Sequence, residues 1–114
     1  MNSLLRLLAA TVILSSLGAC GSARRSEPLA NSPLSLTPAL ARGEKVFQAH
    51  CHQCHVQGEA ALGPALNNKP LPAFLLRTQV RHGLGAMPSF PESRISEDEL
   101  DDLVAYVKAL RKNR

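Results

Sequence analysis

Apolar residues recur at helical spacing in three separate stretches of the chain. The last stretch begins at Ser96, which with Glu99 fits a capping box at the start of a helix. Three basic residues suit the negative end of the helix dipole at the other end of the stretch: Lys108, Arg111 and Lys112. This stretch therefore predicts a helix with one buried apolar face. That face consists of Leu100, Leu103, Val104, Val107 and Leu110.

The first stretch begins with Thr37 and Pro38, a typical N-cap and a typical first helical residue. It predicts a helix that runs as far as Cys51. The residues that recur on one side of this helix are Leu40, Gly43, Phe47 and His50.

A shorter stretch over residues 72–82 predicts a third helix, which ends at Gly83. No segment alternates apolar and polar residues for long enough to predict a strand. The sequence therefore predicts an all-α domain over residues 37–114. The side chains that the short helix is expected to turn toward the interior are Phe74, Leu75, Leu76 and Val80.

The composition changes before this domain. A short positive start that ends at Arg6 and a short apolar stretch after it predict a signal peptide over residues 1–19. Residues 20–36 are rich in Gly, Ser and Pro and predict a flexible tether. Removing the signal peptide removes Arg6 and lowers the formal net charge from +4 to +3. With no continuous basic run and no cluster of aromatic residues, no nucleic acid is expected as a partner.

The signal peptide ends in Leu17-Gly18-Ala19-Cys20, which resembles the lipobox of bacterial lipoproteins. The resemblance implies that Cys20 is acylated and becomes the new N-terminus, so that a lipid anchors the protein to a membrane. Whether this is the inner or the outer membrane stays open. The alternative is a plain signal peptide with an accidental cysteine near its cleavage site.

The candidate chemistry is concentrated in Cys51-His52-Gln53-Cys54-His55, because C-x-x-C-H is the attachment motif of haem c. Two thiols one helical turn apart can form thioethers with both vinyl groups of one porphyrin, and the neutral imidazole of His55 can bind its iron. Zinc usually requires a second pair of ligands, a thioredoxin-like motif requires a βαβ pattern, and a structural disulfide leaves the histidine without a role. We therefore expect one covalently bound haem c.

Further motifs make the domain resemble the class I c-type cytochromes over residues 39–110. The resemblance implies that the carbonyl of Pro64 accepts a hydrogen bond from His55, and that Met87 is the sixth ligand of the iron. His82, five residues before Met87, is the alternative ligand. The segments that carry the resemblance, besides the C-x-x-C-H run, are Gly63-Pro64-Ala65-Leu66 and Gly85-Ala86-Met87-Pro88.

The resemblance also implies that the first and last helices cross through Gly43, Phe47 and Tyr106. His50 and His52, which adjoin the motif, are expected to face solvent rather than to act as ligands. Arg77 and Arg81 either pair with the haem propionates or lie on an exposed helix face.

The function implied by the resemblance is the transfer of single electrons between periplasmic or membrane redox proteins, with no small-molecule substrate and no enzymatic turnover. One alternative is a haem subunit fixed in a larger respiratory or dehydrogenase complex. Another is a haem peroxidase or sensor, which would need an open iron site.

Overall fold

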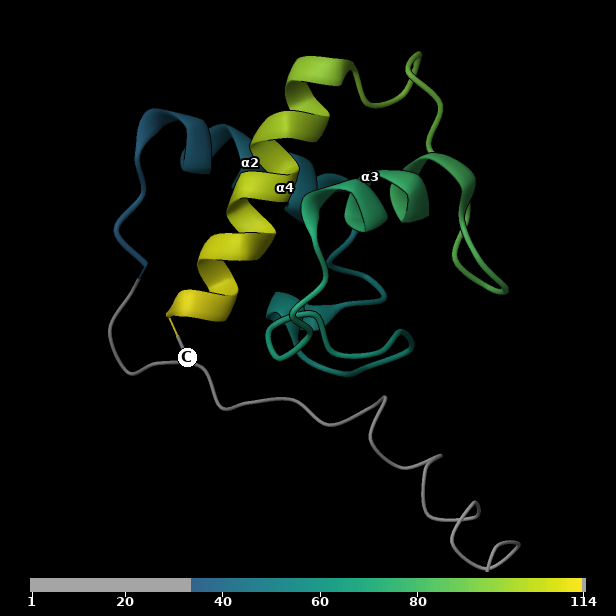
Figure 1. Ribbon diagram of the computed structural model, residues 1–114, viewed down its shortest axis with the longest axis horizontal. Helices are drawn as coiled ribbons and strands as arrows, with labels where there is room; N and C mark the ends of the chain where they lie inside the picture. The colour runs from purple at the N-terminus through teal and green to yellow at the C-terminus, as the bar shows by residue number, and fades with distance from the viewer. Residues whose placement is uncertain (1–33, 114) are drawn as a thin grey trace, which may run out of the picture.

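The computed structural model describes residues 34–113 (Figure 1). The predicted signal peptide, Cys20 and nearly all of the tether lie outside the described residues. Between residues 34 and 113 the structure contains helices but no strand, with one isolated β-bridge between Leu84 and Met87. The prediction of an all-α fold is thus confirmed. In chain order the elements are α2 (Pro38–His50), the short 3-10 helix η2 (Val56–Gly58), α3 (Ala73–His82) and α4 (Glu97–Lys112).

The helices begin where the sequence predicts. At the start of α2, the Thr37 hydroxyl accepts a hydrogen bond from the backbone N–H of Leu40 at 3.3 Å. At the start of α4, the backbone N–H of Glu99 donates to the Ser96 hydroxyl, and the Glu99 carboxylate accepts from the Ser96 backbone N–H at 2.8 Å. This capping box satisfies two backbone groups that a helix end leaves unpaired. The end of α3 lies at Gly83, which has a positive φ of 69°.

The first and last long helices, α2 and α4, cross at close range (Figure 1). A Cβ atom at Gly43 would collide with the backbone carbonyl of Asp102, so the crossing requires a residue without a side chain. Beside it, the rings of Phe47 and Tyr106 lie 5.5 Å apart at 54°. The crossing expected through these residues is therefore present, and the Arg42–Asp102 ion pair at 2.6 Å spans it.

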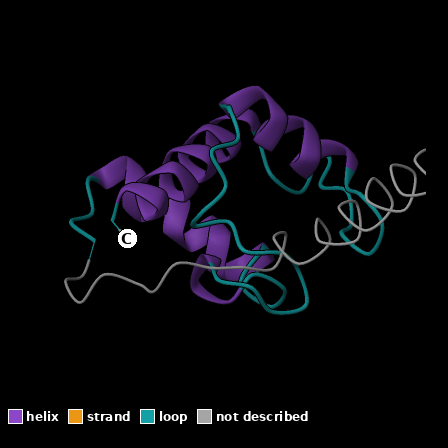
Figure 2. Cartoon of the chain, turned by 60° about the horizontal axis from the view of Figure 1, so that its bottom comes forward, coloured by secondary structure: helices purple, strands orange, loops and turns teal. Residues whose placement is uncertain are grey.

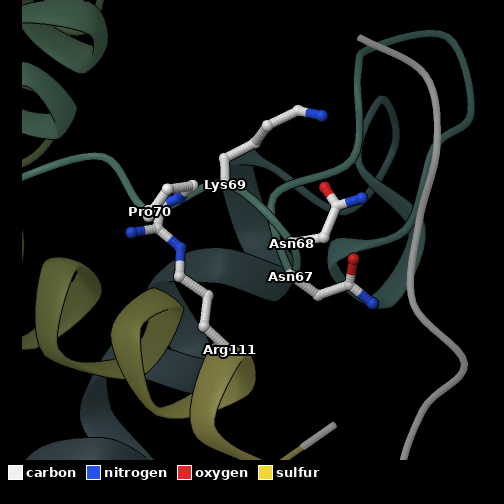
Figure 3. Close-up of a pocket in the computed structure, with 5 residues that line it drawn as sticks. All are labelled: Asn67, Asn68, Lys69, Pro70 and Arg111. Carbon is white, nitrogen blue, oxygen red and sulfur yellow. The ribbon is translucent and has the colours of Figure 1, made fainter. Parts of the chain in front are cut away.

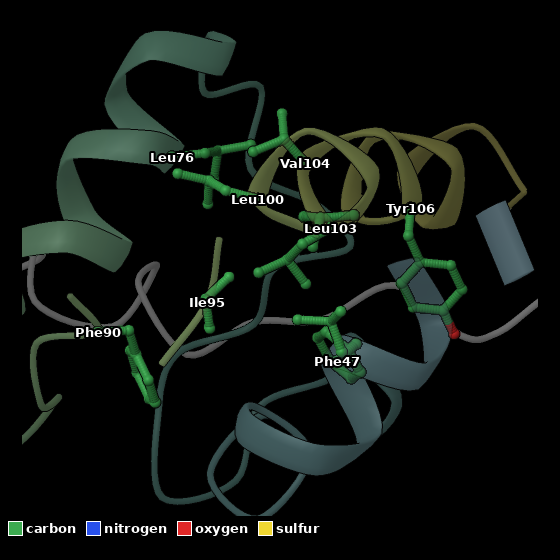
Figure 4. Close-up of a cluster of buried hydrophobic side chains, with 10 residues drawn as sticks. Phe47, Leu76, Phe90, Ile95, Leu100, Leu103, Val104 and Tyr106 are labelled. Atoms are coloured by element: carbon green, nitrogen blue, oxygen red, sulfur yellow. The ribbon is translucent and has the colours of Figure 1, made fainter. Parts of the chain in front are cut away.

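One hydrophobic cluster fills the space between the helices (Figure 4). The face predicted for α4 is buried, apart from Leu110, which is partly buried. In α3 the prediction is only half correct, because Leu76 and Val80 reach the cluster whereas Phe74 and Leu75 are exposed. Leu76 and Val80 are four residues apart and share the face that meets α4, while Phe74 and Leu75 lie on other faces.

Two segments without α-helix, residues 51–72 and 83–96, join the helices (Figure 2). The first carries the C-x-x-C-H run and the Gly63-Pro64 pair, and the second carries Met87. The helices therefore form a scaffold, and the loops hold the residues with candidate chemistry. In the described part of the chain, no helix has the length and the apolar character needed to cross a membrane.

Candidate functional site

The C-x-x-C-H run forms a hydrogen-bonded turn directly after α2. The backbone N–H of Cys51 donates to the carbonyl of Phe47 at 2.8 Å, which continues the helical pattern by one residue. The N–H groups of Cys54 and His55 then both donate to the carbonyl of Cys51, at 3.1 and 2.9 Å. One turn of backbone thus carries both thiols and the imidazole, as the spacing predicts.

Cys51 and Cys54 form no disulfide, and both are half-buried. Burial, with a smaller contribution from Cys54, raises the pKa of Cys51 to about 12. Thiols that act as redox nucleophiles or metal ligands have lowered pKa values instead. A buried thiol with a raised pKa is a poor redox nucleophile, so Cys51 before haem attachment fits poorly with the thioredoxin-like interpretation.

His55 is buried, with 7% of its surface exposed, and its ring is held by one strong contact. Its Nδ1 lies 2.8 Å from the carbonyl oxygen of Pro64, the hydrogen bond that the resemblance implies. Since a carbonyl can only accept, Nδ1 carries the proton and Nε2 keeps its lone pair. Such a bond fixes the orientation of the ring and raises the basicity of the free nitrogen, which suits Nε2 to bind iron.

Gly63 lies against the face of the His55 ring. A Cβ atom at Gly63 would lie 2.8 Å from Nδ1 and 2.9 Å from Nε2, which is too close for any side chain. The backbone N–H of Gly63 also donates to the carbonyl of Cys54 at 2.8 Å. The sequence singled out this glycine only as part of a motif, and its steric role becomes visible in the folded chain.

Arg111 of α4 fastens the loop that follows Pro64 (Figure 3). Its Nε donates to the carbonyl of Leu66 at 2.9 Å, and its Nη1 donates to the carbonyl of Leu71 at 2.8 Å. Partial burial lowers the pKa of Arg111 below its usual value. The guanidinium lines a small pocket with residues 67–70. From the sequence alone, Arg111 was expected only to suit the negative end of the helix dipole. It helps to keep the loop with Pro64 in place.

Met87 is half-buried and packs against the main hydrophobic cluster, as Cys51 does. A tight turn presents it, in which the backbone N–H groups of Leu84 and Met87 each donate to the carbonyl of the other residue, at 3.1 and 3.0 Å. The Sδ atom lies 3.6 Å from Nε2 of Gln79 on α3, within the range of a weak hydrogen bond to sulfur. The sequence alone does not indicate a role for Gln79, because no local pattern links it to Met87.

The remaining histidines have other environments. His82, the alternative sixth ligand, is the exposed last residue of α3. The ring of His50 is half-buried and meets the ring of Phe90 edge to face at 5.8 Å, so His50 faces solvent only in part. His52 is also half-buried, and its Nδ1 accepts a hydrogen bond from the backbone N–H of Gln57 at 3.3 Å.

Arg77 and Arg81 both form ion pairs between α3 and α4. Arg81 pairs with Glu97 at 2.5 Å, and Arg77 pairs with Glu97 at 3.3 Å and with Asp101. The hydrogen bond from Arg81 is the main reason why the pKa of Glu97 lies below its usual value. The structure thus gives both arginines protein partners. This supports neither pairing with the haem propionates nor a place on an exposed helix face, the two roles considered from the sequence.

The residues at this site fit a haem c. Two thiols share one turn, His55 offers an oriented nitrogen, and Met87 is a half-buried thioether on a separate segment. Apolar side chains also remain at the surface near these segments, where Leu62 and Leu84 are 80% and 75% exposed. An apolar porphyrin is a group against which such side chains can pack.

An all-α fold with this turn and this histidine defines a c-type cytochrome. Residues 38–107 match the family described as Cytochrome C oxidase, cbb3-type, subunit III. The chain therefore belongs to this family of class I c-type cytochromes. Its single C-x-x-C-H motif carries one covalently bound haem c.

Individual relatives agree with this assignment. The chain is similar to cytochrome c6 of Gloeothece citriformis, with 36% identity over 63% of this chain and 76% of the relative. It is also similar to cytochrome c6 of Cyanidioschyzon merolae, with 38% identity over 64% and 76% of the two chains. A third relative is the cytochrome c subunit of 4-cresol dehydrogenase from Pseudomonas putida, with 32% identity over 60% and 59%. The protein is thus a monohaem c-type cytochrome, a carrier of single electrons.

Proposed function

We propose that this protein is exported, anchored to a membrane by a lipid on Cys20, and passes single electrons between redox proteins at the periplasmic surface. The observation that carries the redox part is the hydrogen bond of 2.8 Å from His55 to Pro64 within a C-x-x-C-H turn. It prepares one imidazole nitrogen for iron.

We propose that Cys51 and Cys54 hold the haem covalently, and that His55 and Met87 bind its iron from the two sides. Haem c supplies the exchange of one electron between ferric and ferrous iron. The protein supplies the rest: Pro64 orients His55, Gly63 leaves room for its ring, and Gln79 approaches the sulfur of Met87. A thioether favours ferrous iron and so raises the reduction potential.

An electron carrier whose iron has both axial positions occupied differs from a haem enzyme or sensor, because binding of peroxide or another ligand needs an open coordination position. The purified full chain should exchange electrons rapidly with ferricyanide and ascorbate. It should bind neither carbon monoxide when ferrous nor cyanide within seconds when ferric, as checked by absorption spectroscopy. Rapid binding of either ligand, or turnover of peroxide, would place the protein among haem enzymes or sensors.

A fixed subunit of a larger complex is the second candidate function. The family description names an oxidase subunit, and the Pseudomonas relative is named as a dehydrogenase subunit. Purification from native membranes separates the two roles, because a mobile carrier should elute alone at moderate salt. Stable co-elution with an enzyme in constant stoichiometry would support the subunit.

The anchor has its own test. Replacing Cys20 with Ser removes the acylated thiol, so the protein should leave the membrane fraction or remain as an unprocessed precursor. Ser22→Ala, two residues further on, is the matched control and should leave the protein in the membrane fraction. Membrane attachment that survives Cys20→Ser would rule out lipidation at this position, without affecting the assignment of the haem site.

A further inference from the structure

Residues 84–95, here called the methionine loop, lead from α3 to α4 and include no α-helix. Within the loop, the tight turn between Leu84 and Met87 presents the thioether. One backbone hydrogen bond ties the loop back to α3, from the N–H of Phe90 to the carbonyl of Val80 at 2.9 Å. The buried side chains of Phe90 and Ile95 provide further attachment.

Arg81 of α3 adds side-chain hydrogen bonds to this attachment. Its Nη1 donates to two loop carbonyls, that of Phe90 at 3.0 Å and that of Ile95 at 2.6 Å. Its Nη2 donates to the carboxylate of Glu97 at the start of α4, at 2.5 Å. Only 17% of the Arg81 side chain is exposed. A planar guanidinium with several donors can join a helix, a loop and a second helix in this way.

Arg77 lies one turn earlier on α3 and provides an internal comparison. It pairs with the same Glu97 at 3.3 Å, and also with Asp101. Its side chain is about twice as exposed as that of Arg81, at 35%. Both of these partners are carboxylates of α4, so Arg77 links the two helices, whereas Arg81 also holds the methionine loop.

We propose that Arg81 is a positioning residue for the sixth ligand. By tying the carbonyls of Phe90 and Ile95 to Glu97, it keeps the methionine loop closed and thus keeps Met87 in place. This inference rests on the proposed ligation by Met87. A loop without regular structure opens locally at a lower free energy than the whole domain unfolds. Phe90 and Ile95 both follow Met87, so each opening that frees the chain beyond Met87 must break the hydrogen bonds of Arg81.

Replacement of Met87 by imidazole in the ferric, haem-loaded full chain measures this opening. Imidazole at saturating concentration can bind only after the loop has released the iron, so its binding rate reports the opening. The change is followed through the absorption band of the bond between methionine sulfur and ferric iron. Arg81→Gln should accelerate replacement about ten- to a hundredfold, since hydrogen bonds to a charged donor are lost. Arg77→Gln should accelerate it by less than about fivefold, as expected for an exposed ion pair.

Two further variants complete the test. Arg81→Lys keeps the charge but lacks the planar guanidinium with its several donors. Its imidazole rate should therefore be closer to that of Arg81→Gln than to that of wild type. Glu97→Gln should also accelerate replacement, and more than Arg77→Gln does, because Arg81 loses the carboxylate to which its Nη2 donates. Both remain informative if Arg81→Gln does not fold. Denaturant unfolding of each variant gives the unfolding constant, which should rise in Arg81→Gln by about the same factor as the imidazole rate, because both processes break the same hydrogen bonds. Imidazole replacement must stay faster than global unfolding in every variant.

Equal rates in Arg81→Gln and Arg77→Gln would overturn the proposal. So would an unfolding constant that rises in Arg81→Gln while the imidazole rate does not, or imidazole replacement no faster than global unfolding, because Arg81 would then be only a structural residue. The spectrum of the wild type distinguishes this outcome from a failure of the proposed function. If the methionine band is absent from wild type, the ligation by Met87 is wrong; if it is present and Arg81→Gln leaves the rate unchanged, only the role of Arg81 is wrong.

Discussion

His55 is held by two consecutive residues of one loop. Pro64 accepts the Nδ1 proton at 2.8 Å, and Gly63 leaves the space that the ring occupies. The consequence is that the tautomer and orientation of His55, the proposed iron ligand, are fixed before iron binds. At the residue scale, His55 is therefore preorganised to bind iron. The sulfur of Met87 has one weaker polar contact, the one with Gln79.

Gln79→Leu tests that weaker contact. A thioether sulfur has two lone pairs, so Sδ of Met87 can bind iron with one and accept from Gln79 with the other, at 3.6 Å. The hydrogen bond draws electron density from the sulfur and favours ferrous iron. Its loss should lower the reduction potential by about 20–60 mV, the equivalent of one ordinary hydrogen bond.

Potentiometric titration of the two proteins checks this value. Thr78→Val is the matched control, because the exposed Thr78 hydroxyl donates to the carbonyl of Phe74 and does not reach the thioether. A potential that stays constant or rises in Gln79→Leu would show that this contact does not tune the iron.

At the scale of elements, the sequence was most informative about local features. The caps at Thr37 and Ser96 and the stop at Gly83 were predictable, because each depends on residues a few positions apart. The hydrogen bonds of Arg81 and Arg111 could not be predicted, since both side chains bind backbone carbonyls that only the tertiary fold brings near. A sequence pattern does not specify which carbonyl an arginine will meet.

The same distinction holds within the candidate site. The C-x-x-C-H motif identified the thiols and His55 from spacing alone, and the resemblance supplied Pro64 and Met87. Gln79 could not be predicted, because its partner lies across a turn whose shape depends on the fold. Phe74 and Leu75 were placed in the interior because apolar character does not tell which face of a short helix meets the core.

Gly43→Ala tests the crossing of α2 and α4. The new Cβ atom would collide with the backbone of Asp102 and force the helices apart. Overpacking of this kind should lower the free energy of unfolding by about 1–3 kcal/mol. This loss should appear in spite of the gain of about 1 kcal/mol in helix propensity when Ala replaces Gly.

Denaturant unfolding of the haem-loaded protein measures the difference. Lys45→Ala, at an exposed position of the same helix, should change the free energy of unfolding by no more than about 0.5 kcal/mol. A Gly43→Ala protein as stable as wild type would mean that the helices cross elsewhere.

At the scale of the whole molecule, the domain is small, and its helices bury one cluster of apolar side chains. Domains of this size have little core of their own, so a covalently attached porphyrin contributes to stability as well as to function. Loops that the protein must hold around the cofactor are fastened by arginines from α3 and α4. The fold and the redox site are thus parts of one structure. The central claim is that His55 and Met87 bind the iron.

The reduction potential of Met87→Ala, measured with the absorption spectra of both oxidation states, tests that claim most directly. The haem should remain attached through Cys51 and Cys54 and still stain after denaturing electrophoresis. The potential should fall, because the thioether that favours ferrous iron is lost, and the ferric protein should now bind cyanide or imidazole rapidly. His82→Ala should leave the spectra and the potential as in wild type. An unchanged spectrum and potential in Met87→Ala, or the appearance of these changes in His82→Ala instead, would contradict the account.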